Sequence, residues 1–102
     1  MFIPNGCDVF EYLRDFPDMI SVVYDICYDF ECRLKDKAEL TLEVYYGVEP
    51  GYRYLTLYIR QHDYREDIMG FIESVISNYD DRLADVKGWL VVTTDFQKPK
   101  YE

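Results

Sequence analysis

Most motifs that mark an active site are missing from this sequence. It contains no glycine-rich phosphate loop, no serine-centred nucleophile elbow, no HExxH pair of zinc ligands and no EF-hand spacing. Histidine occurs once, at His62, next to an expected helix start, where an exposed polar residue is ordinary. Acidic residues are so numerous that some pair must lie close together, so paired carboxylates do not indicate a glycosidase. We therefore expect no catalytic residue, no metal and no cofactor, which favours a non-catalytic protein over an enzyme.

Disulfide, zinc-ribbon and membrane signatures are missing as well. The three cysteines, Cys7, Cys27 and Cys32, are an odd number and include no CxxC pair, so neither a disulfide framework nor a zinc ribbon is indicated. No apolar run approaches the roughly 18 residues of a membrane-spanning helix, and no basic region followed by an apolar segment opens the chain. We expect a soluble, cytoplasmic protein with one globular domain, 1–102, in which residues 97–102 form a frayed tail.

Positive charge is scarce. The 11 lysines and arginines are outnumbered by 20 aspartates and glutamates, which gives a net charge of −9. The acidic residues concentrate in 1–34 and 62–85, whereas 35–61 is balanced. Such a field repels nucleic acid and anionic membranes and attracts basic proteins or cations, although solubility alone would explain the same charge. We expect a basic protein partner and no direct binding to nucleic acid or membrane.

Two amphipathic helices are predicted. The first is short, covers 5–16 and is ended by Pro17. The second, over 63–83, has the clearest helical periodicity of the chain. Its apolar stripe consists of Tyr64, Ile68, Phe71, Ile72, Val75, Ile76, Tyr79 and Leu83. Asp63 and Glu66 are expected to form a capping box at its start.

Strands are predicted for most of the remaining chain. Apolar residues at even-numbered positions predict a strand over 20–34; a helical spacing also fits these residues, but their β-branched and aromatic content favours the strand. Further strands are predicted over 38–46, 52–60 and 89–94, the last of them in the interior of the sheet. The fold class is therefore α+β: a two-layer sandwich of order α-β-β-β-α-β, with a mainly antiparallel sheet and both helices on one face.

The register of the first two predicted strands defines a candidate site. Their apolar residues share a face if the loop at 35–37 has an odd number of residues, and Asp29 then lies directly opposite Glu43. Carboxylates interleaved with tyrosines suit a surface that receives Lys and Arg side chains, although a solvated face would have the same composition. The predicted partner-binding residues on this outward face are Asp25, Asp29, Glu31, Glu43, Tyr45, Tyr54 and Tyr58.

The predicted strand at 52–60 is apolar on both faces. One face carries Tyr52, Tyr54 and Tyr58 and the other Leu55, Leu57 and Ile59. The pattern does not decide which row faces the helices, but either choice leaves one row on the far side of the sheet. Self-association into a homodimer through this open face would cover it.

Two function classes fit these observations. The first is a small acidic binding protein that covers a basic protein, as an immunity protein or antitoxin covers a toxic nuclease, or a nucleic-acid mimic. The second is a small enzyme or ligand-binding domain with a pocket lined by tyrosine and carboxylates between the helices and the sheet. A flat acidic sheet face favours the first, which is the prediction preferred here, and a deep pocket with convergent polar groups favours the second.

Overall fold

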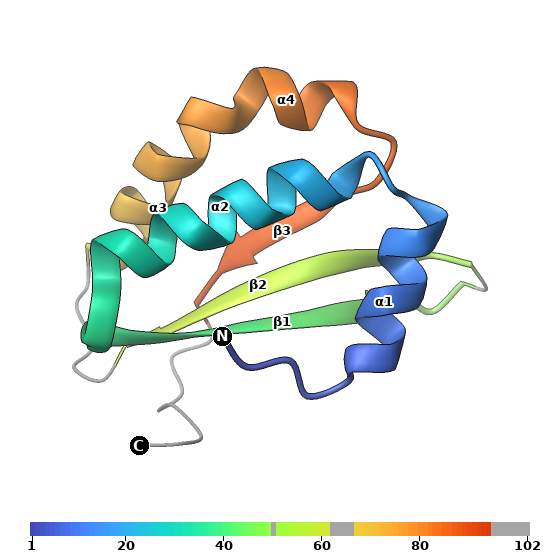
Figure 1. Cartoon of the computed structure of the whole chain (residues 1–102), viewed down its shortest axis with the longest axis horizontal. Coiled ribbons are helices and arrows are strands. Elements are labelled where there is room, and N and C mark those ends of the chain that lie inside the picture. The colour runs from blue at the N-terminus through green and yellow to red at the C-terminus, as the bar shows by residue number, and fades with distance from the viewer. Residues whose placement is uncertain (50, 62–66, 95–102) are drawn as a thin grey trace.

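The computed structural model describes residues 1–49, 51–61 and 67–94 and has an α+β fold (Figure 1). Its elements, in chain order, are α1 (Gly6–Asp15), α2 (Met19–Leu34), η1 (Lys35–Lys37), β1 (Ala38–Tyr46), β2 (Arg53–Gln61), α3 (Ile68–Ile76), η2 (Ser77–Tyr79), α4 (Asp80–Asp85) and β3 (Leu90–Thr93). The α+β class and the first helix are confirmed. The order α-β-β-β-α-β is wrong, because two helices precede the first strand of the sheet.

Residues 20–34, predicted as a strand, belong to helix α2. The even-numbered apolar residues behind that prediction divide into a buried set, Val22, Ile26, Phe30 and Leu34, and an exposed set, Ile20, Tyr24, Tyr28 and Cys32. Residues four apart share a helix face, so a helix with apolar residues on two opposite faces imitates the alternation of a strand. Met19, Val23 and Cys27 are buried too, which extends the stripe that packs α2 into the core.

In the described part of the chain, the sheet has three strands in the order β1-β2-β3. β1 and β2 form an antiparallel hairpin in which Leu42 lies opposite Leu57. β3 pairs parallel to β2, with Leu55 opposite Leu90, because the intervening helices return the chain to the end where β2 began. The sheet is therefore mixed rather than mainly antiparallel, and the last strand lies at one end of the strand order instead of in the interior.

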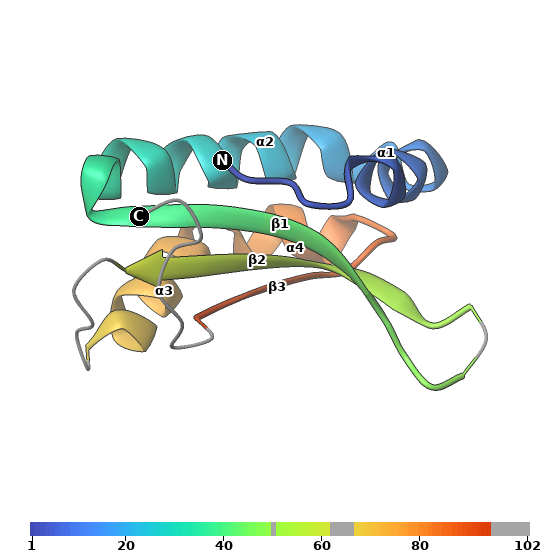
Figure 2. The ribbon, with the colours of Figure 1, turned by 90° about the horizontal axis from the view of Figure 1, so that it is seen from below.

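The row Leu55, Leu57 and Ile59 is fully buried and faces the helices. Figure 2 shows α1 and α2 together on one side of the sheet. Helix α3 packs against α2 and β3 and continues through η2 into α4, which runs beside α2 (Figure 1). The prediction had two helices on the sheet, whereas the structure has α1, α2, α3 and α4. The opposite face, hereafter the open face, carries Glu43, Tyr45, Tyr54, Thr56 and Tyr58. It is most exposed at its hairpin end, around Tyr45, whereas Thr41, Thr56 and Arg60 on the same face are buried.

The helix predicted over 63–83 is divided into α3, η2 and α4. Its apolar stripe is confirmed in α3, where Ile68, Ile72 and Val75 are buried. The predicted start is wrong, since α3 begins at Ile68 and its N-cap residue makes no side-chain capping hydrogen bond. Other residues on which predictions rested lie outside the described residues: His62, Asp63, Glu66 and the tail 97–102. No helix within the described ranges is both long and apolar enough to cross a membrane.

Candidate partner-binding surface

The predicted binding residues do not assemble on one surface. Those on α2 are Asp25, Asp29 and Glu31, and those on β1 and β2 are Glu43, Tyr45, Tyr54 and Tyr58. The predicted opposition of Asp29 and Glu43 is wrong, because Glu43 lies opposite Thr56. That register required residues 20–34 to be a strand, and their helical packing moves the three acidic residues of α2 to the helical side of the sheet.

Each of the three α2 carboxylates has a cation of the same chain beside it. Arg82 Nη1 lies 2.7 Å from Asp25 Oδ2, and Arg33 Nε lies 2.6 Å from Asp29 Oδ1. The N-terminal ammonium group lies 3.2 Å from Glu31 Oε1. Since each of these three negative charges is matched by a positive one, the three carboxylates themselves offer a basic partner little net charge.

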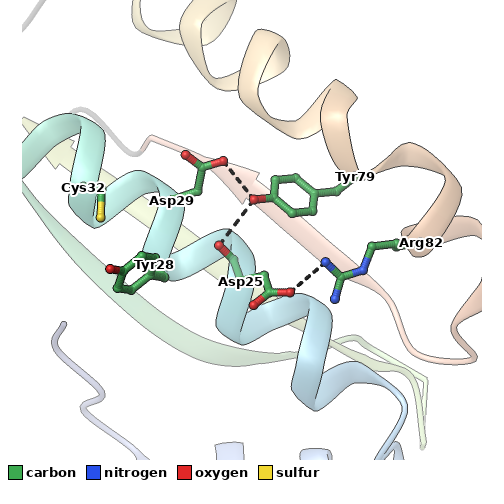
Figure 3. Close-up of a pocket in the computed structure, with 6 residues that line it drawn as sticks. All are labelled: Asp25, Tyr28, Asp29, Cys32, Tyr79 and Arg82. Carbon is green, nitrogen blue, oxygen red and sulfur yellow. Dashed lines mark hydrogen bonds and ion pairs between the residues drawn. The ribbon is translucent and has the colours of Figure 1, made fainter.

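The groove between α2 and the η2–α4 segment is a small pocket of about 270 Å³, lined by Asp25, Tyr28, Asp29, Cys32, Tyr79 and Arg82 (Figure 3). The Tyr79 hydroxyl donates to Asp29 Oδ2 at 2.8 Å. The hydrogen bond from Arg33 lowers the pKa of the Asp29 carboxyl, and that from Tyr79 adds to the effect. Burial raises the pKa of Tyr79, as does its bond to Asp29. These contacts tie η2 and α4 to α2, which is a structural role.

The open face carries a cluster of aromatic rings at the hairpin end of the sheet. This aromatic cluster consists of Tyr45, Tyr52, Tyr54 and Trp89. Tyr45 lies directly across the hairpin from Tyr54, with the ring centroids 4.9 Å apart, and Trp89 lies 5.1 Å from Tyr54 on its other side. Although the rings pack together, Tyr45, Tyr52 and Trp89 are 48%, 45% and 55% exposed. Aromatic residues that remain this accessible are typical of a binding surface.

Hydrogen bonds on both sides of β2 position the cluster at the hairpin end of the sheet. In the hairpin, the Gly47 N–H donates to the Tyr52 carbonyl at 2.8 Å, which closes the turn. Trp89 immediately precedes β3, and its carbonyl accepts from the Leu55 N–H at 3.0 Å. The Trp89 N–H in turn donates to the buried hydroxyl of Tyr12 at 2.9 Å. The rings therefore stand on a backbone fixed by the hairpin, by β2 and by α1.

Two polar groups lie beside the cluster on the open face. Glu43 is two residues before Tyr45 on β1 and has no ion pair or hydrogen bond to any residue that the structure describes. Opposite it, Thr56 is 4% exposed and its Oγ1 has no hydrogen-bond partner in the described part of the chain. Burial raises the pKa of Tyr54, and the adjacent Tyr45 and Tyr52 raise it further, so its hydroxyl stays neutral. The surface thus offers aromatic faces beside one carboxylate.

Tyr58 belongs to a different part of the open face. The Arg60 guanidinium lies 5.2 Å from the centre of its ring, and Arg60 Nη1 also donates to the buried Thr41 hydroxyl at 3.0 Å. Tyr58 is therefore paired within the chain, whereas Tyr45 and Tyr54 join the exposed cluster. Of the predicted site, the structure brings together Glu43, Tyr45 and Tyr54.

The sequence prediction missed two members of the cluster. Tyr52 stands in the same alternating row as Tyr54, so its position on the tyrosine face was a usable signal. Trp89 gave no comparable signal, because its place beside Tyr54 depends on the parallel pairing of β3 with β2.

Comparison of the chain with known protein families, with curated proteins and with solved structures finds no match. In the described residues, no group of three or more His, Cys, Asp or Glu is arranged to hold a metal ion.

Proposed function

We propose that this chain is a small acidic, non-catalytic binding protein that covers a basic protein partner with the open face of its sheet. The observation that carries the proposal is the aromatic cluster, whose four rings are ordered by mutual packing while three of them, Tyr45, Tyr52 and Trp89, remain about half exposed. Tyrosine and tryptophan dominate the energetics of protein interfaces, because they bury a large area at low cost in conformational entropy. The adjacent Glu43 and the net charge of −9 favour a partner of opposite charge.

The class of partner follows from the sign of that charge. A protein of net charge −9 has the same sign as nucleic acid and would compete for a surface that binds it. We therefore place the chain with inhibitors of the immunity-protein or antitoxin type, or with nucleic-acid mimics. A second copy is a less favourable occupant, since two chains of like charge would approach with Glu43 on both surfaces.

A ligand-binding or enzymatic role has weaker support. The pocket between α2 and α4 is lined by tyrosines and carboxylates, but its volume of about 270 Å³ is below the roughly 300–1,000 Å³ of typical ligand sites. Its two carboxylates, Asp25 and Asp29, also form ion pairs with Arg82 and Arg33. The polar groups of this pocket therefore bind one another.

The proposal is tested by affinity capture from lysate of the source organism at low and high salt. The test variant combines Tyr45→Ala with Trp89→Ala, and the matched control combines Tyr24→Ala with Tyr28→Ala, which removes two exposed rings of α2 that stack 6.3 Å apart. A basic protein should be captured by the wild type and the control, lost by the cluster variant, and released by salt. Capture that the cluster variant retains, or a captured partner that is not basic, would overturn the proposal.

A further inference from the structure

Arginines of this chain repeatedly lie over aromatic rings. The guanidinium of Arg53 is 5.2 Å from the Tyr12 ring centre, and that of Arg82 is 5.8 Å from the ring of Tyr79. The Arg60–Tyr58 pair on the open face has the same arrangement. The aromatic cluster differs, since no arginine or lysine among the described residues lies over its four rings.

The four rings of the cluster form a corner, in which one ring stands nearly perpendicular to a row of the other three. Tyr54 is half-buried at the centre, with Tyr45 stacked on one side at an interplanar angle of 25° and Trp89 on the other at 44°. Tyr52 stands nearly upright to this row, at 78° to both Tyr54 and Trp89. A planar cation can therefore lie on the face of one ring while it touches the face or edge of another.

The carboxylate beside the corner completes the arrangement. Glu43 lies on the same face as Tyr45 and is two residues from it, so it stands at the opposite end of the tyrosine pair from Tyr52. Because Glu43 has no cation within the described residues, its charge is available to one from outside. Thr56, which lies directly opposite it, is buried, and its hydroxyl has no hydrogen-bond partner among the described residues.

We propose that the aromatic cluster and Glu43 form a recognition site for an arginine side chain of the basic partner. The inference rests on the proposed function and adds the identity of the group that is recognised. Arginine fits better than lysine, since the guanidinium is planar, stacks on aromatic faces and is weakly hydrated. It also presents two parallel N–H groups to a carboxylate, whereas an ammonium group is a strongly hydrated point charge.

The experiment uses the full chain and three blocked peptides, Gly-Arg-Gly, Gly-Lys-Gly and Gly-citrulline-Gly. Binding is followed by NMR through the indole N–H signal of Trp89, which is unambiguous because the chain has one tryptophan. The arginine peptide should shift this signal and bind at least about fivefold more tightly than the lysine peptide. Citrulline, which is planar but uncharged, should have no measurable effect.

The matched variants are Glu43→Gln and Glu73→Gln, which change the net charge equally; Glu73 is exposed on α3. Glu43→Gln should reduce the affinity for the arginine peptide several-fold, and Glu73→Gln should leave it unchanged. Equal losses of affinity for the arginine peptide in the two variants would overturn the assignment of the site to the aromatic cluster and Glu43. NMR shifts confined to residues of the α2–α4 groove would overturn it as well.

Equal affinity for the arginine and lysine peptides would overturn the arginine selectivity and leave the proposed function standing. No shift of the Trp89 signal with the arginine peptide would overturn the inference as well. The proposed function fails on a different result, namely capture of the partner that does not depend on the cluster.

Discussion

The backbone N–H of Trp89 donates a hydrogen bond of 2.9 Å to the hydroxyl of Tyr12, a residue 77 positions earlier in the chain. Tyr12 belongs to α1 and is 1% exposed, whereas the indole of Trp89 lies in the exposed aromatic cluster. A core residue on the helical side therefore fixes the backbone from which an open-face ring projects. The stability of the core and the geometry of the candidate site are coupled at this bond.

Replacing Tyr12 with Phe should destabilise the protein and disturb the cluster. The change keeps the ring but leaves the Trp89 N–H without its partner, at a cost of about 1–3 kcal/mol. Chemical unfolding measures the loss, and the NMR signal of the Trp89 indole reports the displacement. Tyr24→Phe, on the exposed side of α2, is the control and should change neither. An unaltered indole signal in Tyr12→Phe would contradict the coupling.

Gly88→Ala should also destabilise, because the space beside Gly88 is filled. An added Cβ would lie 2.7 Å from Met19 Cγ and 3.0 Å from the Tyr12 hydroxyl, and Met19 is fully buried. Overpacking of this kind costs about 1–3 kcal/mol. Gly70→Ala is the control: nothing lies within 4 Å of its added Cβ, and alanine within α3 should stabilise by about 0.5–1 kcal/mol. Opposite signs of the two changes in thermal unfolding are expected, and equal signs would contradict this packing.

Ile72→Ala tests the core beneath α3. Ile72 is 2% exposed, and its truncation should cost about 2–5 kcal/mol by leaving a cavity. Ile20→Ala removes the same atoms from a residue of α2 that is 51% exposed, and should change the free energy of unfolding little. Similar effects of the two substitutions in urea denaturation would mean that the buried stripe of α3 is not part of the core.

Asp29→Asn should flatten the dependence of stability on acid pH. The hydrogen bond from Arg33, helped by that from Tyr79, holds the pKa of Asp29 below its ordinary value of 3.8 in the folded state. As pH falls, the unfolded chain binds this proton first. The stabilisation by the carboxylate is therefore complete above the ordinary pKa and is lost as pH falls through the folded pKa.

Wild-type protein should thus lose more stability than Asp29→Asn between neutral and strongly acidic pH, while the variant should be less stable at neutral pH. Denaturant unfolding at a series of pH values measures both curves, with Asp36→Asn in the exposed η1 turn as the control. Parallel curves for wild type and Asp29→Asn would contradict the assigned role of the Arg33 and Tyr79 contacts.

The error over residues 20–34 had a definite physical source. Val22 and Ile26 satisfy both a two-residue and a four-residue spacing, so they fit a strand and a helix equally well. The β-branched and aromatic content, to which Tyr24 and Tyr28 belong, then favoured the strand, whereas these two tyrosines lie on the exposed side of α2. Which side chains are buried depends on the assembled core. A local sequence pattern predicts the buried face of an element only when its other face is polar.

The candidate site was predictable to the extent that it depends on the hairpin. Tyr45 and Tyr54 lie on strands whose alternation is clear, and their placement on one face follows from the pairing of β1 with β2. The acids of α2 were misplaced with their element, and Trp89 joins the cluster only through a pairing between segments more than thirty residues apart in sequence. No local periodicity encodes such a pairing.

The sequence by itself determined the α+β class, the hairpin strands, the apolar stripe of α3 and the net charge of −9, because these depend on composition and on short-range alternation. Only the tertiary structure decided that 20–34 is a helix, that Leu55, Leu57 and Ile59 face the core, and that β3 runs parallel to β2. These features depend on the relative free energies of alternative folds of the whole chain. The fold that buries the largest apolar area while pairing its backbone groups is favoured, and the sequence of a single segment does not reveal which fold that is.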